Sequence, residues 1–242
     1  MKKILLLVIM FLGLYISSQA QLDALKKVVS GGGNSNLGSG LSSDQIVSGL
    51  KEALTIGTEK SASKLSAADG FFKDAVVKVL MPPEAQKVEK TLRSVGMGQL
   101  VDNAILSMNR AAEDASKSAA PIFVDAVKNM SITDALNILR GSDTAATSYL
   151  KKSTTPKLTT AFRPVIDASL QKTDATKYWK SVVDAYNGLP TTFKKVNSDL
   201  PAYVTQKAIA GIFYYVAQEE AKIRKDPAAQ VTGLLKQVFG GK

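Results

Sequence analysis

Apolar residues recur at helical spacing along most of the chain after residue 40. The clearest stripe consists of Leu100, Val101, Ala104, Ile105, Met108, Ala111, Ala112 and Ala115. Apolar residues at every third or fourth position are typical of an amphipathic α-helix. No alternation of apolar and polar residues is long enough to predict a β-strand. The pattern therefore predicts an all-α protein, a single globular bundle of about ten helices without a sheet.

Capping residues and prolines set the expected helix boundaries. Ser131 with Asp134 predicts a capped start, and one residue of the pair Ser198-Asp199 is expected to cap the longest helix. Thr155-Pro156 predicts the start of another helix. Pro164 predicts a kink or a break, because proline has no N–H to donate inside a helix. These signals divide residues 142–171 into more than one helix.

The first twenty residues have a different pattern. Lys2 and Lys3 precede an apolar run from Ile4 to Ile16, and small residues follow at Ser18 and Ala20. This order is typical of a secretory signal peptide. The run is shorter than the roughly 20 apolar residues of a membrane-spanning helix. We therefore expect cleavage after Ala20 and a periplasmic location.

Residues 21–40 separate the signal peptide from the helical pattern. Residues 21–30 predict a short amphipathic segment, and residues 31–40 are rich in Gly, Ser and Asn, as in a flexible linker. The remaining residues, 41–242, form the predicted all-helical domain. They contain no second run of membrane-spanning length, so we expect a soluble protein without a transmembrane segment after cleavage.

The chain contains neither Cys nor His. Disulfides, zinc sites built on thiolate or imidazole, and catalytic groups such as Ser–His–Asp are therefore excluded. An enzyme with this composition would depend on carboxylates, Lys, Tyr, Ser or Thr, or on a hard metal ion held by oxygen atoms. No motif predicts such a metal or any cofactor, so we expect none.

The charge of the chain is basic and unevenly distributed. The net charge is +10, and cleavage of the signal peptide removes Lys2 and Lys3, which leaves +8. Residues 151–195 carry nine basic and three acidic side chains. A basic surface can attract an anionic envelope polymer, but it can also be a solvated helix face. Another envelope protein is a further candidate partner, and we expect no nucleic acid because the protein is expected to be exported.

Three polar residues lie on the helix predicted around residues 100–115. Arg110 and Glu113 fall roughly opposite its apolar stripe, and Asn109 falls at the border. They form a solvated face if this is an outer surface. If other helices cover that face, they form an internal polar network or part of a binding cleft.

A second polar group interrupts the apolar stripe of the longest predicted helix. That stripe consists of Ile209, Ile212, Phe213, Val216 and Ile223. Glu220 falls within it and Glu219 at its edge, while Arg224 follows Glu220 by one turn. A buried carboxylate is costly unless it is paired, and Arg224 is the nearest partner. Two carboxylates beside an arginine can alternatively form an acid–base pair or a hard-metal site.

Four blocks of sequence carry a resemblance to a known family. They are Gly49–Ser61 (GLKEALTIGTEKS), Met108–Ala115 (MNRAAEDA), Ile132–Leu150 (ITDALNILRGSDTAATSYL) and Glu219–Gly240 (EEAKIRKDPAAQVTGLLKQVFG). In this order they resemble an exported bacterial family, the domain of unknown function 4197. The resemblance extends from about Leu41 to Gly240. It implies a helical periplasmic domain, and it implies no activity, substrate or catalytic residue.

These observations lead to an expected function and two alternatives. We expect a binding or scaffolding protein of the cell envelope rather than an enzyme. A carboxylate-dependent hydrolase or lyase would instead require carboxylates such as Glu113 and Glu220 to converge with an arginine in an open cleft. A carrier of an apolar ligand would require a cavity between helices, lined by residues such as Phe213, Val216 and Met108.

Overall fold

The computed structural model describes residues 42–173, 175–188, 195, 199–226, 230 and 232–239. The expected signal peptide, residues 1–20, and the amphipathic segment and linker, residues 21–40, lie outside the described residues. The residues from Ser43 onward belong to one unit, which is the subject of all that follows. In these ranges, none of the helices combines the length and the apolar character needed to cross a bilayer.

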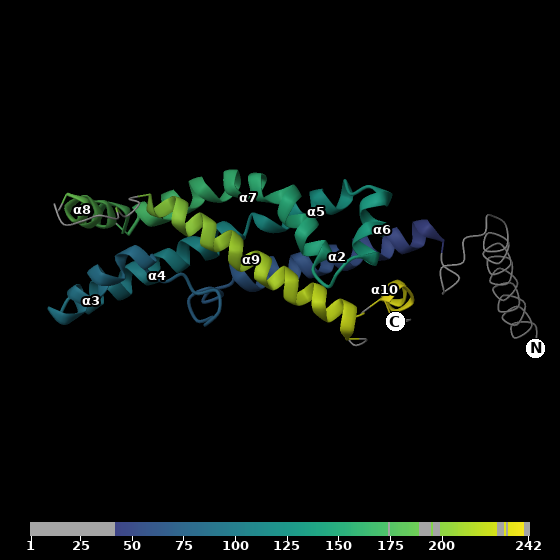
Figure 1. Ribbon diagram of the computed structural model, residues 1–242, viewed down its shortest axis with the longest axis horizontal. Helices are drawn as coiled ribbons and strands as arrows, with labels where there is room; N and C mark the ends of the chain where they lie inside the picture. The colour runs from purple at the N-terminus through teal and green to yellow at the C-terminus, as the bar shows by residue number, and fades with distance from the viewer. Residues whose placement is uncertain are drawn as a thin grey trace, which may run out of the picture. The chain divides into compact units, whose positions relative to one another are not determined.

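The described residues form helices joined by turns and loops, without a strand (Figure 1). The helices are α2 (Ser43–Ser66), the 3-10 helix η1 (Pro83–Ala85), α3 (Gln86–Ser94), α4 (Gly98–Ser116), α5 (Ala119–Lys128), α6 (Ile132–Arg140), α7 (Ala145–Gln171), α8 (Ala175–Asn187), α9 (Leu200–Lys225) and α10 (Gly233–Phe239). The predicted all-α class is confirmed. The described α-helices are fewer than the ten expected.

The helix α7 accounts for part of this difference. It continues through Pro156 and Pro164, where the sequence predicted a new start and a break. Both prolines are exposed. The carbonyl groups that lose an N–H partner belong to Lys152 and Thr160, which are also exposed, so water can satisfy them. The proline signals were therefore wrong as helix boundaries.

Other boundary signals agree with the structure. The Ser131 hydroxyl accepts a hydrogen bond from the N–H of Asp134, and the Asp134 carboxylate accepts from Ser131 in return, which completes a capping box. Asp199 is the N-cap of α9 and accepts a hydrogen bond from the N–H of Ala202. The helix α10 begins at Gly233.

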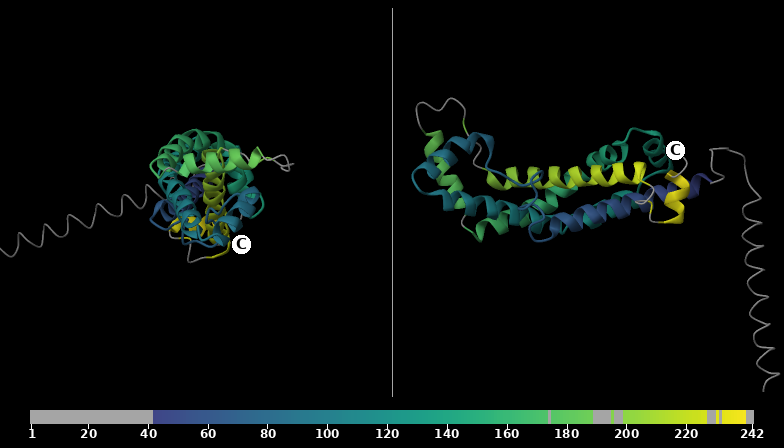
Figure 2. Two further views of the ribbon diagram at one scale, coloured as in Figure 1. Left: turned by 90° about the vertical axis from the view of Figure 1, so that its left-hand side faces the viewer. Right: turned by 90° about the horizontal axis from the view of Figure 1, so that it is seen from below.

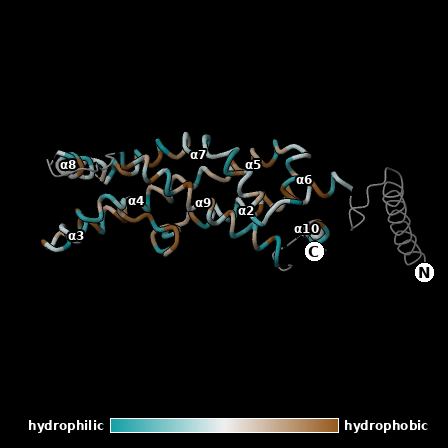
Figure 3. Tube along the Cα trace, in the orientation of Figure 1, coloured by the Kyte–Doolittle hydropathy of each residue, from teal (hydrophilic) through white to brown (hydrophobic). Residues whose placement is uncertain are grey.

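The core lies where α7 and α9 pack side by side (Figure 1) and where α4 packs against α7. α7 buries one apolar residue at every fourth position, and each of these side chains is fully enclosed: Leu150, Leu158, Phe162, Ile166 and Leu170. The small Thr154 takes the remaining position of this row and bonds the Leu150 carbonyl. Figure 3 shows the resulting alternation of apolar and polar segments along the helices. A row at this spacing is the ridge by which two helices interlock.

A long loop, residues 67–82, joins α2 to η1. α2 and α4 follow one another along α9 in two perpendicular views (Figures 1 and 2), and both contact α9. The loop is rich in apolar residues. Phe71 is completely buried, whereas Val76 and Leu80 are more than half exposed. The loop is therefore part core and part surface.

Candidate functional site

Glu113 fastens the loop to α4. One carboxylate oxygen, Oε1, accepts hydrogen bonds of 3.1 Å from the backbone N–H groups of Phe71 and Phe72. The side chain is only 4% exposed. Buried N–H groups outside a helix need an acceptor, and a carboxylate is a strong one. Glu113 thus holds the start of the loop, 41 to 42 residues away in the sequence.

Arg110 connects Glu113 to the loop's acidic residue. Its guanidinium donates to Glu113 Oε2 and to Asp69 Oδ1, each at 2.7 Å, and Lys73 approaches Asp69 from the other side at 2.7 Å. Hydrogen bonds from Lys73 and Arg110 lower the pKa of Asp69, and the bonds to Glu113 and Asp69 raise the pKa of Arg110. Asp69 adopts the left-handed backbone conformation, with φ of 67°. The turn at the beginning of the loop is therefore held by charge as well as by backbone hydrogen bonds.

Asn109 holds the far part of the same loop. Its Oδ1 accepts a 2.8 Å hydrogen bond from the N–H of Val79, and its Nδ2 donates to the carbonyl groups of Val79 and Ile105. The side chain is fully buried. Asn109 and Glu113 are therefore buried beneath a covering segment, and the Arg110 side chain, which is 41% exposed, links Glu113 to that segment from the surface. The sequence analysis considered other helices as the cover of this face. In the structure, the covering segment is a loop.

α9 contacts the loop from another side. The Tyr215 hydroxyl hydrogen-bonds to Asp74, which also accepts from the N–H groups of Val76 and Val77, and Lys64 of α2 lies over the Tyr215 ring. Burial raises the pKa of Asp74, but these hydrogen bonds outweigh it, so the pKa lies below its usual value. Burial, and then the bond to Asp74, raise the pKa of Tyr215.

Glu220 performs a similar task at the beginning of α7. Its carboxylate accepts hydrogen bonds from the N–H of Ala146 at 3.0 Å and from the N–H and hydroxyl of Thr147 at 2.8 and 2.7 Å. Arg224 pairs with it at 2.9 Å and donates to the Ile138 carbonyl. The first N–H groups of a helix have no partner within it, and Glu220 supplies one from α9.

Glu219 points elsewhere. It pairs with Lys222 at 2.7 Å, and its Cβ lies near Gly57 of α2. No hydrogen bond or ion pair joins the Glu113 group to the Glu220 group among the residues that the structure describes. The convergence that a carboxylate-dependent enzyme requires is therefore not found there. The same ranges hold no cluster of three acidic residues suited to a metal ion.

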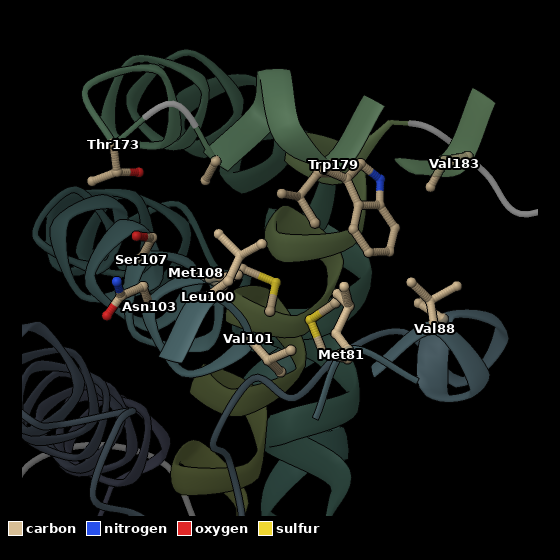
Figure 4. A pocket seen from close by; sticks show the side chains of 15 residues that line it. Met81, Val88, Leu100, Val101, Asn103, Ser107, Met108, Thr173, Trp179 and Val183 are labelled. Atoms are coloured by element: carbon tan, nitrogen blue, oxygen red, sulfur yellow. The ribbon is translucent and has the colours of Figure 1, made fainter. Parts of the chain in front are cut away.

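An apolar groove lies between α3, α4 and α8, closed at one side by residues near η1 (Figure 4). The empty space in and in front of the groove is about 950 Å³, which includes the part open to solvent. Met81, Val101 and Met108 form its floor, and Trp179 and Val183 of α8 stand opposite them. The remaining lining residues are Ala85, Val88, Leu92, Leu100, Asn103, Ala104, Ser107, Thr173, Ala175 and Leu200.

The polar lining residues of this groove gather at one edge. Figure 4 shows Asn103, Ser107 and Thr173 together on one side, while the other labelled residues are apolar. Trp179 is 93% buried, and its indole N–H has no hydrogen-bond partner in the described part of the chain. The groove is thus apolar along most of its length and polar at one edge.

The rim of the groove is unusually apolar. Leu100 lines the groove and is 37% exposed, and the turn just before it exposes Val95 and Met97. α3 presents Val88 and Leu92 to the groove and buries none of its residues completely. Exposed apolar residues that adjoin a groove mark an interaction site more often than isolated ones do.

A second hollow lies between α7 and α9 and is more polar. Lys151, Thr155, Thr159 and Arg163 form one wall, and Phe213 lies on the other. The basic segment that contains this wall is partly neutralised: Lys157 pairs with Asp125, Arg163 with Asp199, and Lys180 with Asp184. Three of the nine basic side chains of residues 151–195 are therefore paired with carboxylates of the protein itself.

The carrier alternative named three lining residues, and only Met108 lines the apolar groove. Phe213 packs edge-on against Phe123, and Val216 is buried in the core. Trp179 was not expected to line a groove, because an aromatic residue on a helix is more often part of the core. The sequence signal that was available is the helical spacing of Val88 and Leu92, two apolar residues on the otherwise polar helix α3.

Comparison with known proteins assigns the family. The model of the family described as Protein of unknown function (DUF4197) matches residues 40–240. The chain belongs to this family. The expectation from the four sequence blocks is therefore confirmed. No curated protein and no solved structure matches the chain. The residues that hold the loop (Asn109, Arg110 and Glu113), the residue that caps α7 (Glu220) and the groove all lie within the region that the DUF4197 model matches.

Proposed function

We propose that this DUF4197 protein is a non-enzymatic binding protein of the cell envelope that holds an apolar ligand in the groove between α3, α4 and α8. The groove with its exposed apolar rim carries the proposal. Its lining is mostly apolar with a few polar groups at one edge, as in small-molecule sites. The signal-peptide pattern of residues 1–20 supports an envelope location.

The two buried glutamates support binding rather than catalysis. Glu113 and Glu220 both use their carboxylate oxygens to accept backbone N–H and arginine donors. A general acid or base must reach a substrate proton at hydrogen-bond distance. Carboxylates whose oxygens are occupied in this way stabilise the fold. The groove, by contrast, is accessible to a ligand.

The experiment uses the only tryptophan of the chain, Trp179, which lies in the groove. N-phenyl-1-naphthylamine, a neutral apolar dye, is titrated into the mature protein, and dye emission and Trp179 emission are both recorded. We expect saturable dye emission with a matching loss of tryptophan emission. A wild-type protein that does not bind the dye would contradict the proposal.

A groove-filling variant and a matched control test where the dye binds. Ala104→Phe places a ring in the open groove, so we expect at least about tenfold weaker binding, equivalent to about 1.4 kcal/mol. Ala168→Phe makes the same change at an exposed position of α7 that does not line the groove. Circular dichroism checks that both variants fold. Equal dye affinity in the two variants would mean that the dye binds elsewhere.

A further inference from the structure

We infer that the ligand of the groove is a single-chain amphiphile with an acidic, oxygen-bearing head group, such as the carboxylate of a fatty acid. This inference rests on the proposed function. The chain lies on the apolar floor between Met81 and Trp179, and the head lies at the edge formed by Asn103, Ser107 and Thr173. The distribution of polarity, hydrogen-bond donors and charge around the groove supports it.

The distribution of polarity requires a ligand with two different ends. A purely apolar ligand would cover the edge of Asn103, Ser107 and Thr173 and remove water from its polar groups without replacing the hydrogen bonds (Figure 4). A fully polar ligand would lose its own hydrogen bonds to water on the apolar floor. An apolar chain with one polar head matches both parts. Met81 and Met108 suit a flexible chain because their side chains adapt to irregular shapes.

The donors at the edge favour a head group that accepts hydrogen bonds. Asn103 accepts from Gln99 through Oδ1, which leaves its Nδ2 as a donor. The Ser107 hydroxyl makes no hydrogen bond to any residue in the described ranges. Asn103 and Ser107 are one helical turn apart on α4, so they can reach the same head group. Thr173 already donates to the Leu170 carbonyl and can only accept.

The hydrogen-bond donors at the edge, beside a basic residue, favour an acidic head over a cationic one. Lys172 precedes Thr173 directly, is exposed, and has no acidic partner among the described residues. Asp102 precedes Asn103 and pairs with Arg93 at 2.8 Å, and Arg93 also pairs with Glu89 at 3.0 Å. A carboxylate or a phosphate therefore accepts hydrogen bonds from the donors at this edge, whereas an alkylammonium offers those donors no acceptor.

The volume favours one chain over two. The space of about 950 Å³ includes the part open to solvent, so the enclosed part is smaller. The enclosed part therefore has room for one slender chain rather than two. A lipid with two long chains would leave one chain in water. The carboxylate of a free fatty acid and the phosphate of a single-chain phospholipid share the required chemistry.

The test compares three single-chain probes below their micelle concentrations: dodecanoate, a dodecanoyl lysophosphatidylglycerol and dodecylammonium. Binding is followed by Trp179 emission and by displacement of N-phenyl-1-naphthylamine. We expect both anionic probes to displace the dye and dodecylammonium to bind at least about tenfold more weakly. Displacement by only one anionic probe identifies the carboxylate or the phosphate as the source of the head group.

The variant Asn103→Ala/Ser107→Ala locates the head group. Both positions are on α4 and partly or fully exposed, and alanine is a good helix former, so the variant keeps the fold. Loss of two hydrogen bonds is expected to weaken binding of the anionic probes about 10-fold or more, while the neutral dye binds as before. The control is Ser169→Ala on α7, outside the groove. It should change neither the affinity for the anionic probes nor the affinity for the dye.

The outcomes separate the inference from the proposed function. Dye binding with no preference for the anionic probes, or with no effect of the double variant, would overturn the inference and leave the groove as a site for neutral apolar ligands. Absence of binding by the dye and by every probe would overturn the proposed function itself. Dodecanoate binding that survives Ala104→Phe would place the amphiphile outside the groove and overturn the inference.

Discussion

Glu220 of α9 accepts a 3.0 Å hydrogen bond from the backbone N–H of Ala146 in the first turn of α7, although 74 residues separate them in the sequence. A helix usually receives such a bond from a capping residue next to it. Thr144, the N-cap of α7, makes no capping bond through its side chain. The cap of α7 is therefore supplied by the tertiary structure, and it fixes the relative position of the two longest helices.

Replacing Glu220 by glutamine is expected to lower the free energy of unfolding by about 2–4 kcal/mol. The substitution leaves Arg224 without its carboxylate and faces an amide group toward Thr147, so buried donors lose their acceptor. Chemical denaturation at pH 7 measures the change. Glu219→Gln is the control, since its exposed pair with Lys222 is worth less than about 1 kcal/mol. Unchanged stability in Glu220→Gln would contradict the capping role.

Asn109→Asp tests the clamp at the end of the loop. Aspartate has nearly the same shape but cannot donate to the carbonyl groups of Val79 and Ile105, and it places a charge beside them. We expect a loss of about 2–4 kcal/mol at neutral pH. Faster proteolysis within residues 67–82 should accompany it. The exposed Asn103→Asp on the same helix should cost less than about 1 kcal/mol, and equal losses would count against the clamp.

The lowered pKa of Asp74 predicts how the stability of the folded protein depends on pH. Its pKa in the folded protein lies below the ordinary value of 3.8, so its stabilisation is present above that value and is lost as the pH falls through the folded-state pKa. Asp74→Asn should lower stability by about 1–2 kcal/mol at pH 7. The difference in stability between the wild type and Asp74→Asn should narrow below about pH 4. Thermal unfolding from pH 2 to 7 measures it, and a gap that widens in acid would refute the assignment.

Gly211 and Gly57 offer two alanine substitutions of opposite expected sign. Alanine normally stabilises a helix by up to about 1 kcal/mol relative to glycine. At Gly211 the added Cβ would lie 2.7 Å from the ring of Phe71, which is fully buried and cannot yield, so we expect a net loss of about 1–2 kcal/mol.

At Gly57 the nearest atom is the Cβ of Glu219 at 3.4 Å, an ordinary contact, so Gly57→Ala should raise stability by up to about 1 kcal/mol. The free energies of unfolding of both variants are measured against the wild type. A gain at both positions would show that the loop carrying Phe71 moves aside easily.

The helices could be predicted because their signals are local. The stripe of α4, the capping box at Ser131 and the cap at Asp199 depend on residues within a turn or two of each other. The pairing of Glu220 with Arg224 is also local. The prolines of α7 misled because the tolerance of a helix for proline depends on which face is exposed, and that is set by distant partners.

The role of the loop could not be predicted in the same way. Glu113 was identified as a polar residue opposite the apolar stripe, but its partners are N–H groups 41 to 42 residues away. Backbone N–H groups carry no sequence signal. The groove likewise depends on where α7 and α9 hold α8 relative to α4, a position that neither helix encodes by itself. Periodicity reveals that a face is unusual, and only the fold reveals what covers it.

The position of the single tryptophan also determines what an unfolding experiment can observe. Trp179 lies on α8, which packs against α7 and α9 at one end of the bundle (Figure 1). Its emission is therefore a local signal for the α8 end of the bundle, whereas far-ultraviolet circular dichroism averages over all helices. If α8 opens before the rest, the fluorescence transition will precede the dichroism transition. Coincident transitions would instead identify α8 as part of the same cooperative unit as the core.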